Sequence, residues 1–436
     1  MEDFIVSLVI FTSIYAVFGL GLNMQWGFTG LINFGHVAFM TLGSYTTVLL
    51  SQAGVPLVLA AIGGGCVAAG LGLLIGVSTL RLRTDYLAIV TIGVAEVIRS
   101  IAVNEEWLTG GTFGIQRFPL PLQGFNPSFL TRIGMIVVLT VVVGLAYFQL
   151  WQWLRQHLKR VSLAVLGRGS LVALVYLGTL TLLLVAIATA SQTLKRAELL
   201  PPWVLGLALL GAIVAVCWGY LTLAKRVQFR VEGWSPGLML ISTLFCALVG
   251  IWIFGYMVSA IYNYSNPTKT GLMWVSVLMV ALLYAALQRL VRSPWGRVLK
   301  AIREDEEVAK ALGKNVFWYK LQSLMVGGLC AGIAGSLYAW QLTTVFPDNF
   351  LPLITFNAWT IVMLGGAGSN VGTLMGAAIF WGYDSITRFI LRDIVPLDDV
   401  SLGAFRVMII GLILMGLMVW RPQGILGKKE ELSLGR

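Results

Sequence analysis

Residues 292–319, RSPWGRVLKAIREDEEVAKALGKNVFWY, gather charged side chains in a chain that is otherwise largely apolar. Ser293 followed by Pro294 is typical of a helix start, and Gly313 is typical of a helix end. The stretch therefore predicts one amphipathic helix between two membrane spans, either a solvated loop or a docking element. The residues that recur at spacings of three or four along this helix, all but one of them apolar, are Val298, Ile302, Asp305, Ala309 and Leu312.

The composition of the whole chain places these charges in a membrane protein. Of its 436 residues, 58% are hydrophobic and 11% are charged, and the mean hydropathy is +0.86. Soluble domains carry about 25% charged residues. We therefore expect an all-α fold, a polytopic bundle of membrane-spanning helices. The net charge of +11 needs no nucleic-acid partner, because lysine and arginine collect in the cytoplasmic loops of such proteins.

Hydropathy divides the chain into about 13 apolar elements. The N-terminus, MEDFIVSLVIF, is acidic and unlike a secretory signal, so we expect a retained first span that starts outside. Basic turns at alternate loops then put the C-terminus in the cytoplasm. The expected apolar stretches are 4–24, 34–53, 56–80, 85–103, 132–154, 169–190, 203–224, 237–260, 272–291, 317–342, 353–364, 371–391 and 403–420.

One pair of these stretches does not fit a simple span. The run 353–364 is too short to cross a hydrocarbon core of about 30 Å as a helix. The sequence GGAGSN, residues 365–370, separates it from the next apolar run, 371–391. The sequence therefore predicts a broken or re-entrant helix near 353–370.

The sequence contains no recognisable catalytic, nucleotide-binding or metal-binding motif. Gly313 and Lys314 are followed by Asn315 and lack the glycine-rich lead of a P-loop, and neither HExxH nor GxSxG occurs. The only histidines are His36 and His157, and the four cysteines are isolated in apolar stretches. We therefore expect no enzyme, no metal site and no cofactor in this chain.

Ionisable residues inside the spans form two pairs. Glu96 and Arg99 lie three residues apart, and Asp384 and Arg388 lie four apart, so each pair can neutralise itself on one helix face. Each pair belongs either to a transport pathway or helix contact, or to a self-paired structural bridge near an interface.

Small and polar residues are the candidates for a translocation path. His36 lies in the glycine-rich segment 27–45, and it either lines a polar pathway or bonds to a backbone carbonyl at a helix end. LTGG, residues 108–111, and GGAGSN are candidate ligand-facing backbone, because broken helices beside glycine expose N–H groups. The expected path residues are Gly30, Asn33, His36, Glu96, Gly110, Gly111, Gly365, Gly366 and Ser369.

Three blocks of sequence together resemble one family. They are GFTGLINFGHVAFMTLGSY; LRLRTDYLAIVTIGVAEVIR followed by LTGGTFGI; and RSPWGRVLKAIREDEEVAKALGKN with GGAGSNVGTLMGA and WRPQGIL. Their order and wording are similar to the branched-chain amino-acid permeases of ATP-binding-cassette (ABC) importers, the LivM-like subunit. The resemblance covers roughly residues 1–118 and 272–427.

The resemblance implies a permease core in two parts, 1–131 and 261–427, with a cytoplasmic coupling loop at 292–316. Residues 132–260 have no recognised counterpart in the family, so we expect them to form an extra block of four spans. Residues 428–436 form a cytoplasmic tail.

Such permeases pair with a homologous second permease, two cytoplasmic ATP-binding subunits and a periplasmic substrate-binding protein in the bacterial inner membrane. The resemblance therefore implies that the charged loop docks into the ATPase subunits, which favours a docking element over a solvated loop. The coupling residues expected here are Arg297, Ile302, Glu306, Ala309, Leu312 and Gly313.

The implied function is inward transport of neutral, branched-chain amino acids by alternating access, driven by ATP that the partner subunits bind. The binding protein delivers its substrate to the outer loops 104–131 and 343–352 in this scheme. A urea or amide importer is the alternative within the family. An ion-coupled secondary carrier is the alternative from another class, and it needs unpaired acids inside the spans.

Overall fold

The computed structural model describes residues 1–80, 84–158, 234–394, 399–420 and 424–426, with a few isolated residues between 167 and 219. Helices dominate these residues, and the two strands have two residues each. Within this described part, seven helices are long and apolar enough to cross a membrane, or up to eight if a bent pair counts as one span. The prediction of an all-α, polytopic bundle is confirmed. The expected stretches 169–190 and 203–224 lie almost entirely outside the described residues.

The chain divides into two compact units. The first unit contains Met1–Met135, Ser259–Tyr383 and Gly411–Arg436, and the second contains Ile136–Val258 and Asp384–Ile410.

The first unit begins with a span that does not end as an ordinary helix. The helix α1 (Glu2–Leu22) runs directly into a π-helical turn, η1 (Asn23–Gly27), and together they form one apolar span. The helix α2 (Val37–Gln52) starts later than the predicted stretch 34–53, because residues 28–36 are not helical. The helices α3 (Leu57–Thr79) and α4 (Thr84–Asn104) agree with the expected spans.

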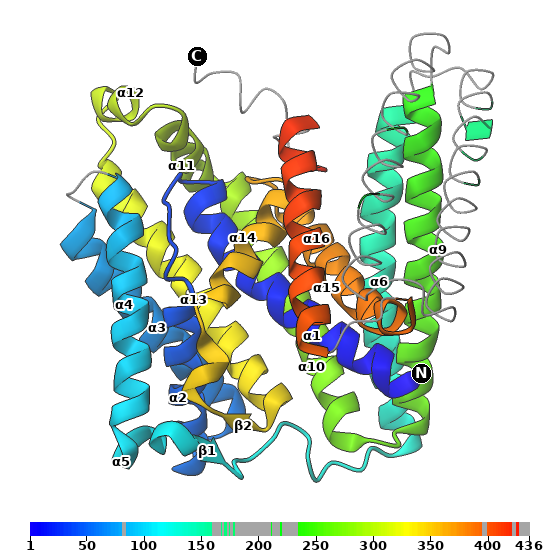
Figure 1. Cartoon of the computed structure of the whole chain (residues 1–436), viewed down its shortest axis with the longest axis horizontal. Helices are drawn as coiled ribbons and strands as arrows, with labels where there is room; N and C mark the ends of the chain where they lie inside the picture. Colours follow the sequence, from blue (N-terminus) through cyan, green and yellow to red (C-terminus); the bar gives the residue numbers. More distant parts are fainter. Residues whose placement is uncertain are drawn as a thin grey trace. The chain divides into compact units, whose positions relative to one another are not determined.

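The helix α13 (Val316–Leu342) is the central element of this unit and packs against α1, α2 and α3 (Figure 1). Its approach to α2 and α3 depends on glycine. A Cβ atom added to Gly43 of α2 would lie 2.3 Å from the carbonyl oxygen of Gly332, and one added to Gly332 would lie 2.6 Å from the Cβ of Ala68 in α3. Small residues of this kind let membrane helices pack backbone against backbone. The helix α10 (Pro267–Arg292) packs against α1.

Two loops meet at one end of the first unit (Figure 1). Two short strands pair antiparallel there, with Ile115 opposite Val345. The stretches predicted as outer loops, 104–131 and 343–352, are therefore joined by backbone hydrogen bonds. The elements of this end are α5 (Glu106–Thr109), the 3-10 turn η2 (Gly111–Phe113), β1 (Ile115–Gln116), β2 (Thr344–Val345) and the 3-10 turn η3 (Pro347–Phe350).

A bent pair of helices follows. The helix α14 (Leu353–Gly365) is followed by the helix α15 (Asn370–Ile394), and the chain bends by 117° at the break between them. Gly366 and Gly368 in this break have φ values of +111° and +81°, a region that side chains with a Cβ rarely enter. The predicted broken helix near 353–370 is confirmed.

Residues 424–426 return to the end of α14. The N–H groups of Ile425 and Leu426 donate hydrogen bonds of 3.0 Å each to the carbonyl oxygens of Leu364 and Gly365. Because the last carbonyls of an α-helix have no partner within the helix, this short segment completes the C-terminal end of α14.

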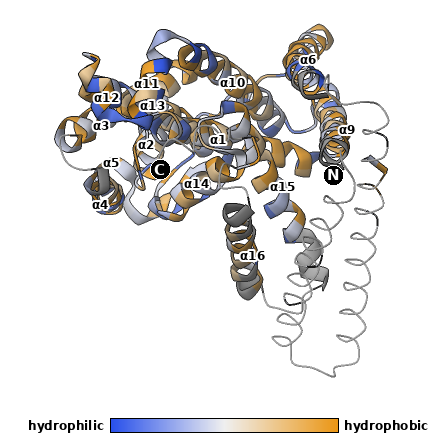
Figure 2. Ribbon diagram, turned by 90° about the horizontal axis from the view of Figure 1, so that it is seen from above, coloured by the Kyte–Doolittle hydropathy of each residue, from blue (hydrophilic) through white to orange (hydrophobic). Residues whose placement is uncertain are grey.

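The second unit contains most of α6 (Phe129–Leu158) and α9 (Trp234–Asn263), together with the adjoining parts of α15 and α16 (Asp399–Trp420). The hydroxyl of Tyr147 in α6 donates a 2.7 Å hydrogen bond to the carbonyl of Ala247 in α9. Both helices are largely apolar (Figure 2), and they expose large apolar side chains, as lipid-facing helices do. Examples are Val141, Leu145, Phe148, Phe245 and Leu248. The assignment of 132–260 as an inserted block stays a prediction.

Candidate functional site

The charged loop between α10 and α13 contains two helices where the sequence predicts one. The helix α11 (Pro294–Glu304) starts after Ser293, as expected, although the Ser293 hydroxyl donates to the carbonyl of Leu290 and does not cap the helix. The helix α12 (Glu306–Ala311) follows after a single extended residue, Asp305, with φ −154° and ψ 110°.

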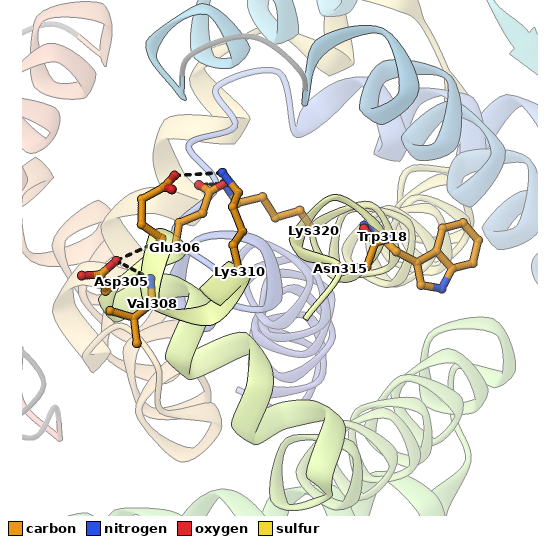
Figure 3. Close-up of polar contacts among 8 residues, drawn as sticks. Asp305, Glu306, Val308, Lys310, Asn315, Trp318 and Lys320 are labelled. Carbon is orange, nitrogen blue, oxygen red and sulfur yellow. Dashed lines mark hydrogen bonds and ion pairs between the residues drawn. The ribbon is translucent and has the colours of Figure 1, made fainter. Parts of the chain in front are cut away.

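Asp305 explains the break. Its Oδ1 atom accepts hydrogen bonds from the N–H groups of Glu307 at 2.9 Å and Val308 at 3.0 Å (Figure 3). These N–H groups belong to the first turn of α12 and lack partners within it, so the carboxylate starts a new helix. The prediction of one continuous helix is wrong because Asp305, which has the spacing of an apolar-face residue, acts as an N-cap.

The predicted apolar face is divided as a result. Ile302 and Ala309 are buried within this chain, where they form a cluster with Val316 at the start of α13. Val298 and Tyr319 pack against this cluster. Leu312, which the single-helix prediction placed on the same face, is 72% exposed.

One ion pair, between Glu306 and Lys320, joins α12 to the central helix α13. Glu306 accepts hydrogen bonds from Lys320 of α13 and from Lys310, whose Nζ lies 3.2 Å from Oε1 of Glu306 (Figure 3). Burial raises the pKa of Glu306, but its contacts with Lys320 and Lys310 outweigh burial and hold the pKa below its ordinary value. Hydrogen bonds to Glu307 and Glu306 raise the pKa of Lys310.

The remaining residues expected to couple the loop also lie in it. Gly313 ends α12 with φ +73° and donates its N–H to the carbonyl of Lys310 at 2.9 Å, the conformation predicted for a helix stop. Arg297 is exposed on α11. Asn315 then caps α13, because its side chain accepts from the N–H of Trp318 at 3.2 Å (Figure 3). The loop thus has a defined fold from 294 to 316.

Beside this loop, the chain between η1 and α2 is unwound and largely buried. Residues 28–36 have no helical structure, although they lie within a bundle of spans. Irregular backbone at membrane depth is tolerated where protein covers it or where it lines a cavity. Gly30 has φ +77° in this segment, so a side chain with a Cβ would be strained there. Of the expected path residues, Gly30, Asn33 and His36 lie here.

Asn33 organises the hydrogen bonds of the unwound segment. Its amide donates to Oε1 of Gln25 at 2.8 Å, and Nε2 of Gln25 donates to the carbonyl of Leu324 in α13 at 3.1 Å. The indole of Trp359 in α14 donates to the Asn33 carbonyl at 3.0 Å. Asn33 and Gln25 are fully buried. The segment is therefore linked both to the central helix and to the bent pair.

His36 stands at the end of this segment, directly before α2. Its Nε2 atom lies 3.2 Å from the carbonyl oxygen of Phe18 in α1, which confirms the expected contact with a backbone carbonyl. Its Nδ1 atom is buried and has no hydrogen-bond partner among the described residues. The next N–H, that of Val37, donates to the Thr355 hydroxyl of α14 at 2.9 Å.

The turn between α14 and α15 contacts the end of the first span. The Asn23 side chain accepts from the N–H of Gly368 at 2.9 Å and donates to Oδ1 of Asn370 at 3.1 Å. Asn370 in turn donates to Oε1 of Gln288 in α10 at 3.1 Å. The N–H groups of Gly366 and Ser369 bond to carbonyls of α14 and of the turn itself. The backbone that the sequence suggested as ligand-facing is therefore engaged within the chain at Gly366, Gly368 and Ser369.

The other expected path residues lie toward the end with the paired strands. Arg99 bonds Glu96 at 2.8 Å, so the predicted pair is present, and it also lies 3.3 Å from Asp348 in η3. Gly110 and Gly111 both have positive φ, and they join the end of α5 to η2. The second predicted pair, Asp384 and Arg388, is also present, at 2.8 Å.

The sequence reasoning missed several residues of the polar interior. Asn23, Gln25, Thr29 and Ser323 are buried, and Asn23 and Gln25 are polar residues at the end of an otherwise apolar span. Polar residues inside a membrane span indicate a functional position, so the sequence did contain a signal for Asn23 and Gln25. The described residues contain no group of three or more His, Cys, Asp or Glu that could hold a metal ion.

An apolar helical bundle with a buried polar, unwound segment and an ion-paired loop beside it is the architecture of a polytopic membrane protein. The chain belongs to the family described as the branched-chain amino acid transport system / permease component, whose model matches residues 4–156 and 159–418. The resemblance found in the sequence is thereby confirmed.

Two LivM proteins and a LivH protein are among the proteins similar to this chain. The chain is 25% identical to the high-affinity branched-chain amino acid transport system permease protein LivM of Salmonella typhimurium, over 97% of this chain and 69% of that protein. It is 26% identical to LivM of Escherichia coli, again over 97% of this chain and 69% of that protein. It is 27% identical to LivH of Escherichia coli over 42% of this chain and 54% of LivH. No solved structure gives a significant match.

Proposed function

We propose that this chain is the permease subunit of an ABC importer that moves branched-chain or other neutral amino acids inward. Separate ATPase subunits drive the alternating access of the bundle. The names of the two LivM proteins, both permeases for branched-chain amino acids, support the substrate class. The chain itself makes no covalent bond to the substrate, and ATP is bound by the partner subunits.

The observation that carries this proposal is the loop 292–316. An ion pair and a buried cluster hold it against α13, yet the side chains of Val308 and Leu312 are 55% and 72% exposed. These two residues are four apart, so they share one side of α12 and its end. Exposed apolar side chains on a structured, charged loop favour contact with another protein. We assign that contact to the ATPase subunits.

A second permease subunit completes the transport path in this proposal. The names of LivM and LivH describe two permease proteins of one kind of transport system, and this chain is similar to both. We propose a LivH-like partner, two ATPase subunits and a substrate-binding protein. The binding protein docks at the end that β1 and β2 join.

The proposed orientation puts the loop 292–316 in the cytoplasm of a bacterium and the paired strands outside its inner membrane. Basic residues of the loop, among them Arg297, Lys300 and Arg303, support this orientation. Residues 424–426 bond to the last two residues of α14, and the turn that follows α14 contacts Asn23 in η1, the element that also bonds to Arg303 of the loop. A cytoplasmic C-terminus fits the same arrangement.

Two other functions make different predictions. A urea or amide importer has the same architecture and differs in its substrate. An ion-coupled carrier needs free acids within the spans, whereas Glu96 and Asp384 each pair with an arginine. This pairing favours an ATP-driven importer over an ion-coupled carrier.

Reconstitution of the complete complex in liposomes tests the proposal. The measurement is uptake of labelled leucine with ATP on the ATPase side, while ionophores collapse the proton and sodium gradients. ATP-dependent uptake that valine and isoleucine inhibit is the expected result. Uptake that follows an ion gradient without ATP would overturn the proposal. Inhibition of uptake by urea but not by valine would indicate a urea or amide importer.

A further inference from the structure

The first span ends next to the coupling loop, and the loop supplies one of its hydrogen-bond donors. The last carbonyls of a helix have no partner within it. Most carbonyls of η1 accept a hydrogen bond from the residues that follow or from α13. The carbonyls of Asn23, Gln25 and Trp26 accept from the N–H groups of Phe28, Leu31 and Gly30, and that of Met24 accepts from the Ser323 hydroxyl. The carbonyl of Gly27 accepts from the guanidinium of Arg303 in α11.

Two neighbouring contacts hold α11 to the same place. A Cβ atom on Gly30 would lie 3.6 Å from Cγ and 3.9 Å from Cα of Arg303, so the unwound chain passes directly over this residue. The Lys300 ammonium lies 5.7 Å from the centroid of the Phe28 ring, within the range of a cation–π contact. Thus α11 touches the start of segment 28–36 at Gly27, Phe28 and Gly30.

The same segment reaches the interior of the bundle a few residues later. Asn33 bonds to Gln25, which bonds to α13, and its carbonyl accepts from Trp359 of α14. Because residues 28–36 are not helical, the segment can shift without breaking a ladder of helical hydrogen bonds. A movement at Gly27 therefore has a short covalent route to the contacts of Asn33.

We propose that Arg303 is a positioning residue that ties movement of the coupling loop to the unwound segment 28–36. This rests on the proposed function, in which ATPase subunits move α11 through the loop. The guanidinium is a rigid, permanently charged fork, and a cation at the end of a helix is favoured by the helix dipole. When α11 shifts, Arg303 draws the Gly27 carbonyl with it, and the segment that carries Asn33 rearranges.

The first test compares Arg303→Gln and Arg303→Lys with Glu304→Gln, a control at an exposed residue of the same helix that is not among the expected coupling residues. Each complex is reconstituted, and leucine uptake is divided by ATP hydrolysed. We expect Arg303→Gln to retain its ATPase subunits and to hydrolyse ATP, while uptake per ATP falls on the order of tenfold. Lysine, which is shorter, should restore part of the ratio, and Glu304→Gln should match the parent. A parental ratio in Arg303→Gln would overturn the proposal.

A second test uses the parent complex and needs no variant. Hydrogen exchange is measured with and without a non-hydrolysable ATP analogue. The amides of 28–36 should change together with those of 294–311. A change confined to 294–311 would overturn the proposal even if Arg303→Gln does not fold. If the amides of 28–36 do not change but the ATPase subunits stay bound, only the role of Arg303 is contradicted. A complex that binds no ATPase subunit would contradict the proposed function itself.

Discussion

Glu306 in α12 accepts a hydrogen bond from Lys320, which lies in α13 fourteen residues further along the chain. This pair joins the charged loop to the central helix of the first unit. Together with the buried cluster of Ile302, Ala309 and Val316, it makes the loop a structured attachment to the bundle. The loop therefore has the rigidity that a lever between two proteins needs.

Replacement of Glu306 by glutamine tests the ion pair through its pH dependence. The folded pKa of Glu306 lies below its ordinary value of 4.5, so its ionised form stabilises the fold. That contribution is complete above the unfolded pKa and is lost as the pH falls through the lower, folded pKa. We expect Glu306→Gln to melt below the parent at pH 7, and the two melting temperatures to converge in acid.

The control for this experiment is Glu307→Gln, because the Glu307 side chain is 83% exposed and pairs with Lys310 alone among the described ion pairs. Its melting temperature should stay close to the parental value. A gap between Glu306→Gln and the parent that is the same at pH 7 and at pH 3 would contradict the assignment.

Asp305→Ala should loosen α12 without unfolding the bundle. The substitution removes the acceptor for the N–H groups of Glu307 and Val308 and should cost about 1 kcal/mol. Hydrogen exchange of residues 306–311 measures this loss directly. Asp305→Asn keeps an acceptor and should exchange almost as slowly as the parent. Equal exchange in the alanine variant and the parent would show that the cap is not needed.

Gly35→Ala should destabilise the first unit. A Cβ atom at this position would lie 1.8 Å from the carbonyl oxygen of Thr91 in α4, so the unwound segment and α4 would have to move apart. Such overpacking costs about 1–3 kcal/mol. The matched control is Gly93→Ala in α4, where a Cβ atom meets nothing within 4 Å. Thermal unfolding in detergent should separate the two variants, and equal melting temperatures would contradict the close approach.

A C-terminal deletion should affect the bent pair only when it removes residues 424–426. A chain that ends at 426 keeps the bonds from Ile425 and Leu426 to α14, whereas a chain that ends at 423 loses both. Two lost hydrogen bonds cost about 2 kcal/mol. We expect faster hydrogen exchange in the last turn of α14 and in 366–369 for the shorter chain. Identical exchange in the two truncated proteins would mean that the segment does not stabilise α14.

The sequence predicted the features that depend on length, hydropathy and local chemistry. Long apolar runs produced the spans, and the short run 353–364 with its glycines produced the bent pair. Ser293 with Pro294 marked the start of α11, and Gly313 marked the end of α12. Each of these signals acts within a few residues of the structure it predicts.

The features that the sequence did not reveal depend on contacts between distant residues. Asp305 has the spacing of an apolar face, and only its hydrogen bonds to the next turn show that it starts a helix. Periodicity placed Ile302 and Ala309 on an apolar face, but it did not show that residues of the same chain cover that face. The bond from Arg303 to Gly27 joins residues 276 positions apart, which no local pattern encodes.

The most direct test of the coupling account is retention of the ATPase subunits by Leu312→Asp. This change puts a charge at the exposed apolar position of the loop and leaves the buried cluster intact. Ala311→Asp, an exposed neighbour, is the control for the added charge. The complexes are purified through a tag on the permease, and the bound ATPase subunits are quantified. We expect Leu312→Asp to lose most of its ATPase subunits and its ATP-driven uptake, while Ala311→Asp keeps more of both. Full retention of ATPase subunits and uptake by Leu312→Asp would contradict the coupling account.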